Sequence, residues 1–202
     1  MTVAGAVLAA GRGSRFEGSE HKLLAPFRGR PVVWWAVQAA RGAGLDALYV
    51  ITGAVDLTGA LAGIGSPSGG PVLDRDGTGP TVALVANPRW AEGQATSVGV
   101  ALDRAAADGH EAVVIGLGDQ PMIPASAWSA VAAADTPIAV AGFDGVRRPP
   151  VRLHRKVWAQ IPRTGDEGAR RWWRERPELV SEIPCSGNPI DIDTLEDLRR
   201  WN

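Results

Sequence analysis

Cysteine, lysine and histidine are scarce in this chain of 202 residues. Cys185 is the only cysteine, which excludes an internal disulfide and a cysteine cage for a metal ion. Lys22 and Lys156 are the only lysines among 21 basic residues, so arginine supplies almost all of the positive charge. The three histidines are scattered and lack the spacing of metal ligands. For His21 we expect a solvated position in a loop.

The sequence also lacks a long hydrophobic run and a large net charge. Residues 3–10 are apolar but too few to span a membrane, and the basic region of a signal peptide is missing before them. The formal net charge is −1, which creates no overall field toward nucleic acid or an acidic membrane. We therefore expect a cytoplasmic protein that binds neither. This length is typical of one domain with a sizeable core, which we expect residues 1–202 to form.

Short apolar runs alternate with amphipathic stretches over the first two thirds of the sequence. The predicted buried strands, which are partly β-branched, are residues 3–9, 47–52, 81–86, 112–117 and 137–141. Apolar residues at helical spacing predict helices after Pro31, around 98–105 and at 125–134. The alternation is typical of an α/β fold with a mostly parallel sheet and helices on both of its faces.

Two segments differ from this pattern. Residues 63–80 are rich in glycine, proline and serine and predict a surface loop within the domain, because the strand pattern resumes immediately after them. Residues 143–202 are rich in arginine and tryptophan, and they predict helices at 166–176 and 194–201.

The first apolar run ends in a glycine loop that two cations follow. Gly11 and Gly13 let the backbone approach a ligand and turn its N–H groups toward it. Arg15 and Lys22 can then neutralise an anion held by those groups. Ligands of open α/β sheets bind beyond the carboxyl ends of the strands, where this loop lies. The loop is a candidate site for a nucleoside triphosphate, and the alternative is a glycine-rich turn with solvated charges.

Two other phosphate-binding loops fit these residues poorly. A dinucleotide-binding loop has a third glycine, where this chain has Phe16, and an acidic residue roughly 20 positions later, which is missing here. A Walker loop ends in Gly-Lys-Ser or Gly-Lys-Thr, and the sequence contains neither triplet.

Two acidic segments are candidates for binding a cation. Asp119 follows an apolar run within a sharp turn, and Mg²⁺ prefers one or two carboxylates together with substrate phosphates. Alternation places Asp191 and Asp193 on one face of an extended segment, so that with Asp119 they could clamp one cation. Two alternatives remain: Asp119 can simply form the turn, and Thr194 can cap a helix with Asp197 as its partner.

In their order along the chain, these segments resemble the MobA-like nucleotidyltransferases, and most of all the molybdenum cofactor cytidylyltransferases. The resemblance covers the chain from Val3 to Trp201. The segments that carry it are Leu-Ala-Ala-Gly-x-x-x-Arg at 8–15, Lys22, residues 87–97, Gly-Asp-Gln-Pro at 118–121, residues 165–170 and Asp-x-Asp-Thr at 191–194. It implies a three-layer α/β sandwich of the nucleotide-diphospho-sugar transferase type with a mostly parallel, Rossmann-like sheet. The nucleotide-binding half would be at about 1–122 and the acceptor-binding half at about 123–202.

The resemblance also implies a role for individual residues. Arg15 and Lys22 would bind the triphosphate, and with Asp119 they would be the catalytic residues. Asp119 and Asp193 would hold Mg²⁺, with Asp191 as their neighbour. The base and phosphates would contact the residues of the first loop, which are Leu8, Ala9, Ala10, Gly11 and Gly13. The acceptor would lie against Gln94, Ser97 and Arg147.

The nucleotide and the acceptor are each suggested by a short segment. Ala9-Ala10-Gly11 resembles the cytidylyl branch, because guanylyl relatives usually have Gly-Gly at the last two places, and CTP is therefore expected. Pro149 replaces the histidine of a Gly-His-Pro segment in many relatives, and Arg147 or Arg148 could take over its contact with an anion. The gap between Arg15 and Lys22 is about two residues longer than usual, so the loop must bulge.

The implied activity is the transfer of CMP from CTP to a phosphorylated pterin, the molybdenum cofactor, with Mg²⁺ and with release of pyrophosphate. A molybdoenzyme would then be a further partner. The two alternatives are an NAD(P)-dependent reductase, which Phe16 disfavours, and a non-catalytic maturation factor for a molybdoenzyme. The charged residues Arg15, Lys22, Asp119 and Asp193 argue against the latter.

Overall fold

Strands and helices alternate along the chain and assemble around one seven-stranded sheet. The computed structural model describes residues 1–62, 80, 82–165 and 174–202. The strand order is β5-β4-β1-β6-β8-β7-β9. The strands are β1 (Val3–Ala9), β4 (Ala47–Thr52), β5 (Val82–Ala86), β6 (Ala112–Leu117), β7 (Ile138–Phe143), β8 (Val146–His154) and β9 (Val180–Pro184), and a separate two-stranded sheet contains β2 (Pro26–Phe27) and β3 (Arg30–Pro31).

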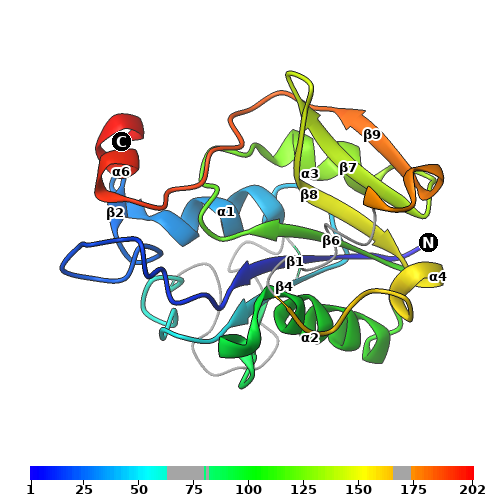
Figure 1. Cartoon of the computed structure of the whole chain (residues 1–202), viewed down its shortest axis with the longest axis horizontal. Helices are drawn as coiled ribbons and strands as arrows, with labels where there is room; N and C mark the ends of the chain where they lie inside the picture. Colours follow the sequence, from blue (N-terminus) through cyan, green and yellow to red (C-terminus); the bar gives the residue numbers. More distant parts are fainter. Residues whose placement is uncertain (63–79, 81, 166–173) are drawn as a thin grey trace.

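Helices cover both faces of this sheet. The helices are α1 (Val32–Arg41), α2 (Gln94–Ala107), α3 (Ala125–Ala132), α4 (Arg155–Trp158) and α6 (Leu195–Trp201), with short 3-10 helices η1 (Trp90–Glu92) and η2 (Pro177–Leu179). In Figure 1, α1 and α3 lie above the sheet and α2 lies below it. β8 is antiparallel to β6 and β7, whereas the other paired strands of the large sheet are parallel. The predicted α/β class and mostly parallel sheet are thus confirmed.

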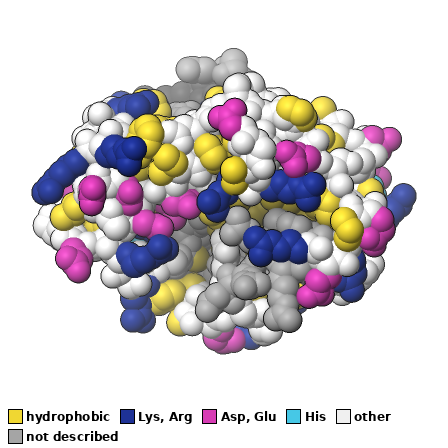
Figure 2. All heavy atoms as spheres, turned by 45° about the horizontal axis from the view of Figure 1, so that its top comes forward, with side chains coloured by type: hydrophobic (Ala, Val, Ile, Leu, Met, Phe, Trp, Pro, Cys, Tyr) yellow, Lys and Arg dark blue, Asp and Glu magenta, His cyan; other side chains and the backbone are white. Residues whose placement is uncertain are grey.

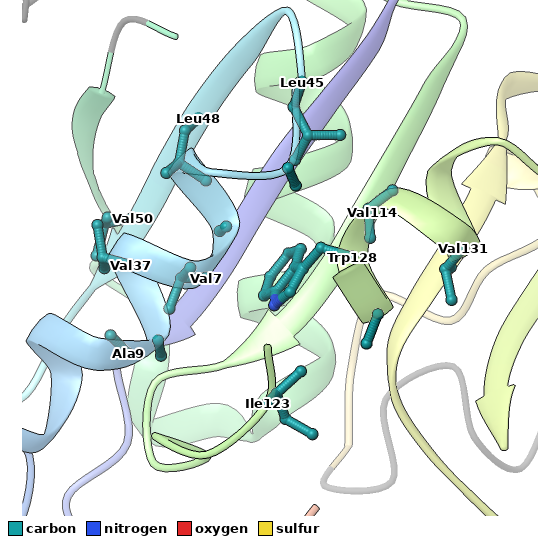
Figure 3. Close-up of a cluster of buried hydrophobic side chains, with 14 of the residues drawn as sticks. Val7, Ala9, Val37, Leu45, Leu48, Val50, Val114, Ile123, Trp128 and Val131 are labelled. Atoms are coloured by element: carbon teal, nitrogen blue, oxygen red, sulfur yellow. The ribbon is translucent and has the colours of Figure 1, made fainter. Parts of the chain in front are cut away.

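The core lies on both sides of β1, all seven residues of which are buried. Side chains that alternate along β1 enter two different clusters: Val7 faces α1 and α3, and Leu8 faces α2. Burial on both faces explains why the central strands are continuous apolar runs. Trp128 of α3 is the centre of the first cluster, among Val7, Val114 and Ile123 (Figure 3).

Most of the predicted elements lie where the sequence placed them. The five predicted strands correspond to β1, β4, β5, β6 and β7, and the helix predicted at 194–201 is α6. β8 and β9 were not predicted. The helix predicted at 166–176 and the loop predicted at 63–80 lie mainly outside the described residues.

None of the described helices is long and apolar enough to span a membrane. Basic and acidic side chains are interspersed on the face that Figure 2 shows, without a large patch of one sign. This distribution agrees with the small net charge of the whole chain.

Candidate active site

The glycine loop and the Asp119 turn lie side by side because β1 and β6 are neighbours. The parallel register pairs Leu8 with Leu117, so both strands end at the same level of the sheet. The backbone N–H of Gly118 donates to the Leu8 carbonyl over 2.9 Å. A Cβ atom at Gly118 would come within 3.2 Å of the Ala9 Cβ, so this approach favours glycine. Asp119 therefore follows β6 directly beside the loop.

The closing acidic segment reaches the same point from the other end of the chain. The backbone N–H of Ile192 donates to the Asp119 carbonyl over 2.8 Å, and its side chain is fully buried. Gln120 Nε2 donates to Asp191 Oδ1 over 2.9 Å. Thr194 and Asp197 form a capping box at the start of α6. The helix-capping interpretation of this segment is confirmed, and its aspartates also lie beside Asp119, where their role as metal ligands stays a prediction.

Lys22 connects the two carboxylates. Its Nζ donates to Asp119 Oδ2 over 2.6 Å and to Asp193 Oδ1 over 2.7 Å. Arg15 Nη2 lies 2.9 Å from the other oxygen of Asp193. The Lys22 side chain is only 11% exposed, whereas that of Arg15 is 75% exposed, so the first pair of contacts is the better shielded from water. Four predicted site residues thus form one charged cluster, which we call the charge cluster: Arg15, Lys22, Asp119 and Asp193.

The pKa values of two groups record this proximity. Burial is the largest influence on Lys22 and by itself disfavours the ammonium, but the contacts with Asp119 and Asp193 together raise its pKa. The pKa of Asp191 is raised to about 6, first by burial and then by the negative charges of Asp119 and Asp193. Three carboxylates therefore lie close enough to repel one another, as expected where a cation would be held.

The carboxylates fit a divalent cation that also binds substrate phosphates. Asp119 Oδ1 is buried, and it has no hydrogen-bond partner among the described residues. Its other oxygen and Asp193 Oδ1 converge on the ammonium of Lys22, a position that already carries positive charge. Within the described ranges, no group of three His, Cys, Asp or Glu side chains forms a metal site of protein ligands alone. Two carboxylates plus phosphate oxygens suit Mg²⁺ or Mn²⁺.

A cavity of about 550 Å³ opens beside the charge cluster. The five nucleotide-binding residues predicted in the first loop all line it, as do Lys22 and Asp119. The other lining residues are Arg12, Ser14, Leu23, Trp90, Ala91, Gly93, Gln94, Ser97 and Leu117. The predicted acceptor-side residues Gln94 and Ser97 therefore face the same cavity as the predicted nucleotide-binding residues.

The wall opposite the glycine loop is held by a buried polar network. Asn87 is 2% exposed, and its Nδ2 donates to Thr96 Oγ1 and Ser97 Oγ, both over 2.9 Å. The Thr96 hydroxyl in turn donates to the Gly93 carbonyl over 2.8 Å. Gly93 has φ 108°, a conformation that strongly favours glycine, and it places Gln94 at the first turn of α2.

The long gap before Lys22 is accommodated by His21 and Phe16. His21 Nδ1 accepts from the Leu23 N–H over 3.2 Å, so Nε2 carries the hydrogen and donates to the Gly11 carbonyl over 3.0 Å. Phe16 packs against the small cluster around Ile192. His21 lies in a loop as expected, but it is only partly exposed, and its ring joins the glycine loop to the segment that carries Lys22.

The two adjacent arginines of β8 have different surroundings. Arg147 Nε pairs with Glu182 Oε2 of β9 over 2.8 Å, and its side chain is about half exposed. Arg148 is less exposed, and its charge lowers the pKa of Asp191. Arg148 is therefore within electrostatic range of the carboxylates. Arg147 instead reaches across β7 to its partner on the edge strand β9.

Sequence reasoning missed two residues with large side chains in the cavity wall. Arg12 and Trp90 line it, and the Arg12 guanidinium lies 5.4 Å from the Trp90 ring centroid. Position alone could have indicated Arg12, because it lies between Gly11 and Gly13. Trp90 gave no signal of its own, since tryptophan is common in this sequence and η1 is only three residues long.

Comparison with known proteins agrees with this geometry. The model of the MobA-like NTP transferase domain matches residues 5–180. The purine catabolism protein PucB of Bacillus subtilis is 29% identical, over 96% of this chain and 92% of that protein. The nicotine blue oxidoreductase of Paenarthrobacter nicotinovorans is 28% identical, over 98% and 95%.

Among solved structures, Rv0371c of Mycobacterium tuberculosis superposes with a TM-score of 0.77 and 27% identity, over 99% of this chain and 97% of that one. Rv0371c has also been solved in complex with manganese. The family match covers most of the chain, and the strand order of the sheet agrees with it. The chain therefore belongs to the MobA-like NTP transferase family and is an enzyme of the nucleotidyltransferase class.

Proposed function

We propose that this enzyme transfers CMP from CTP to a phosphorylated acceptor, such as the molybdenum cofactor, with Mg²⁺ and with release of pyrophosphate. The observation that carries the proposal is the charge cluster beside the cavity. Arg15 and Lys22 would supply cations for a triphosphate, while Asp119 and Asp193 would supply carboxylates for a metal ion, and three ion pairs link the four residues in one chain. A single anion site would need only the cations.

The order of strands in the sheet supports binding of the nucleotide by one half of the domain and of the acceptor by the other half. The nucleotide would lie at the ends of the parallel strands β5, β4, β1 and β6, which belong to residues 1–122. The acceptor would approach over β8, β7 and β9, where Arg147 and Arg148 follow one another. Gln94 and Ser97 would meet it from the opposite wall of the cavity.

Asp119 and Asp193 would hold the Mg²⁺, with Asp191 close by. When bound, the cation would neutralise phosphate charge and fix the orientation of the triphosphate. The manganese complex of Rv0371c supports a divalent cation in this family. The unpartnered, buried oxygen of Asp119 supports its assignment as a ligand on this chain's own residues.

The transfer needs no protein nucleophile. A phosphate oxygen of the acceptor would attack the α-phosphorus of CTP in line, the bond from the α-phosphorus to its bridging oxygen would break, and pyrophosphate would leave. The acceptor is already an anion, so a strong base is not required. Lys22 and Arg15 would stabilise the charge that develops on the leaving pyrophosphate, and the rigid walls of the cavity would align the two substrates.

CTP is proposed on Ala9 and Ala10, and the pterin acceptor on the resemblance of the whole chain to the cytidylyl branch. These substrates and a soluble chain with no described membrane helix suit action in the cytoplasm. Neither relative named above is described as a cytidylyltransferase, so the choice of substrates rests on this chain's residues.

The test is pyrophosphate release by the purified protein with each of the four NTPs, with and without molybdenum cofactor and Mg²⁺. We expect CTP to be turned over only when both are present. Asp119→Asn and Lys22→Ala should each lower turnover by roughly 10²–10³, as loss of one charge-stabilising group does. Lys156→Ala is the matched control, because the only other lysine is exposed on α4 and should leave turnover unchanged.

The result that contradicts the proposal is wild-type turnover in either site variant. Thermal unfolding of each variant must be followed in parallel, since loss of Lys22 leaves two carboxylates unpaired. Release of pyrophosphate from another NTP would keep the reaction class but overturn the choice of base.

A second candidate function is an NAD(P)-dependent reductase. The relative from Paenarthrobacter nicotinovorans, which is named an oxidoreductase, favours it. Phe16 in place of a third glycine, and the aspartates around Lys22, disfavour it. Quenching of NADPH fluorescence and oxidation of NADPH measure it directly, and micromolar NADPH binding that excludes CTP would support the reductase.

A further inference from the structure

The cavity has one charged end and one aromatic end. Lys22 and Asp119 lie at its charged end, and Trp90 provides the only aromatic ring among the described residues that line it. The Arg12 guanidinium lies over this ring, 5.4 Å from its centroid, so the two groups form one stack. A ligand that spans the cavity would therefore meet a flat stack of an indole ring and a guanidinium at one end, and the ions of Lys22 and Asp119 at the other.

The Trp90 ring is held in place by close backbone contacts. A Cβ atom added at Gly53 would lie 2.7 Å from Trp90 Cβ and Cγ and 2.7 Å from the Ala10 carbonyl oxygen. Gly53 thus lets the loops after β1 and β4 close on the tryptophan. Within its own segment, the backbone N–H of Trp90 donates to the carbonyl of Asn87 over 3.3 Å. A ring fixed in this way loses little conformational entropy when a ligand stacks on it.

The strand order sets the direction in which a ligand would span the cavity. Trp90 follows β5 and contacts Gly53, which follows β4, whereas Asp119 follows β6 on the other side of β1. Neighbouring strands are about 4.8 Å apart, so the ends of β5 and β6, three spacings apart, are separated by about 14 Å. An extended nucleoside triphosphate has comparable length. Its phosphates belong at the β6 side, which contains the charge cluster, and this leaves its planar base at the β4–β5 side.

We propose that Trp90, together with the Arg12 guanidinium over its ring, is the platform on which the nucleobase stacks. The proposal rests on the proposed function, because it needs a nucleoside triphosphate in this cavity. Stacking on an aromatic ring tolerates every base, since every base has a π-face. Trp90 therefore supplies affinity for the nucleoside end of the substrate and leaves the choice between bases to other contacts.

The test separates the two ends of the ligand by using two probes. The Mg²⁺ complexes of the four NTPs contain a base, and the Mg²⁺ complex of inorganic tripolyphosphate does not. We expect Trp90→Leu to weaken binding of all four NTPs by roughly ten- to a hundredfold, and to leave tripolyphosphate binding within about twofold. Trp90→Phe, which keeps a ring, should recover most of the NTP affinity. Lys22→Ala should weaken both probes.

Calorimetric titration of the full chain measures these affinities. Trp34→Leu on α1 is the matched control, since Trp34 does not line this cavity, and its affinities should equal those of the wild type. Unchanged NTP binding in Trp90→Leu overturns the inference. So does an equal loss for NTPs and tripolyphosphate, because Trp90 would then act only by supporting the loops.

Two further results keep the test decisive. If Trp90→Leu does not fold, Trp90→Phe decides, provided that its stability equals that of the wild type. A small loss of NTP affinity that spares tripolyphosphate then supports stacking, whereas no loss, or an equal loss for both probes, contradicts it. If the wild-type protein binds no NTP at all, the proposed function fails with it. If the wild type binds NTPs but Trp90→Leu binds them equally well, only the present inference fails.

Discussion

His21 shows how a single side chain can couple two parts of the active site. Its ring bridges the Gly11 carbonyl and the Leu23 N–H, and Lys22, which lies between His21 and Leu23 in the chain, carries the ammonium of the charge cluster. Both bonds require the neutral ring with its hydrogen on Nε2. Burial, followed by the charge of Lys22, lowers the pKa of His21 from its ordinary value of 6.5 in spite of the bond to Gly11. A proton on Nδ1 would remove the acceptor for Leu23.

We predict that His21 makes the protein lose stability on acidification. Its pKa is lower in the folded than in the unfolded chain, so its contribution is fully present above pH 6.5 and is lost as pH falls from 6.5 through the lowered value. His21→Gln cannot titrate, and the difference in free energy of unfolding between it and the wild type should shrink over this window. Urea titrations from pH 7.5 to pH 5 measure it. His154, whose pKa is also lowered, cancels in this difference, and a difference that is constant with pH would contradict the prediction.

The residues of the site could be predicted by type, but their partners could not. Lys22 follows the glycine loop, Asp119 follows a predicted strand and Asp193 lies in an alternating acidic segment, and the resemblance to a known family implies the role of each. Their separation in sequence hides the contacts, since Lys22 and Asp193 are 171 residues apart. The roles of His21 and Trp90 depend on ring positions that the fold alone defines, so the sequence placed neither at the site.

Among the elements, β6 and α3 depend on a glycine whose role is in packing. A Cβ atom at Gly116 would lie 2.3 Å from Cζ2 of Trp128, a ring that is only 2% exposed at the centre of the core. Gly116 precedes the Gly-Asp-Gln-Pro turn of the site, but its role is in packing: its lack of a side chain leaves room for the Trp128 indole. The glycine is part of the core, and the cavity is lined by other residues.

Gly116→Ala should therefore destabilise the fold, because overpacking of a filled core costs about 1–3 kcal/mol. Chemical denaturation of the variant and the wild type measures the loss. Gly59→Ala is the control: no heavy atom lies within 4 Å of its added Cβ, and its free energy of unfolding should stay within about 0.5 kcal/mol of the wild type. Wild-type stability of Gly116→Ala would show that Trp128 can move without cost.

The elements that the sequence missed are those whose composition is least strand-like. β8 contains Arg147, Arg148, Pro149 and Pro150, and proline removes the N–H that a strand normally donates. The prolines are tolerated because the register with β7 shifts there, between Val140 and Ala141, so that neither is paired with a residue of β7. β9 lies at the edge of the sheet and has no buried residue, so it lacks the apolar run that identified the central strands.

For the whole molecule, ligand binding should raise the free energy of unfolding and therefore the Tm. The charge cluster joins residues from the first loop, the β6 turn and the C-terminal segment, so a ligand that binds the cluster holds all three in the folded arrangement. A ligand at a hundred times its Kd stabilises the folded state by about 2.7 kcal/mol. For a chain of this length, 1 kcal/mol corresponds to about 2–4 °C in Tm, and the expected rise is therefore about 5–11 °C.

We predict this rise for CTP with Mg²⁺ and only a small part of it for CTP with EDTA, because the cation joins the phosphates to Asp119 and Asp193. Scanning calorimetry of the full chain gives both values. In Asp119→Asn the rise with Mg²⁺ and CTP should shrink toward the value measured with EDTA, whereas Lys156→Ala should keep all of it. A rise in Tm that is equal with and without the cation would show that Asp119 and Asp193 do not hold a cation that binds the nucleotide. A rise with NADPH in place of CTP would instead favour the reductase.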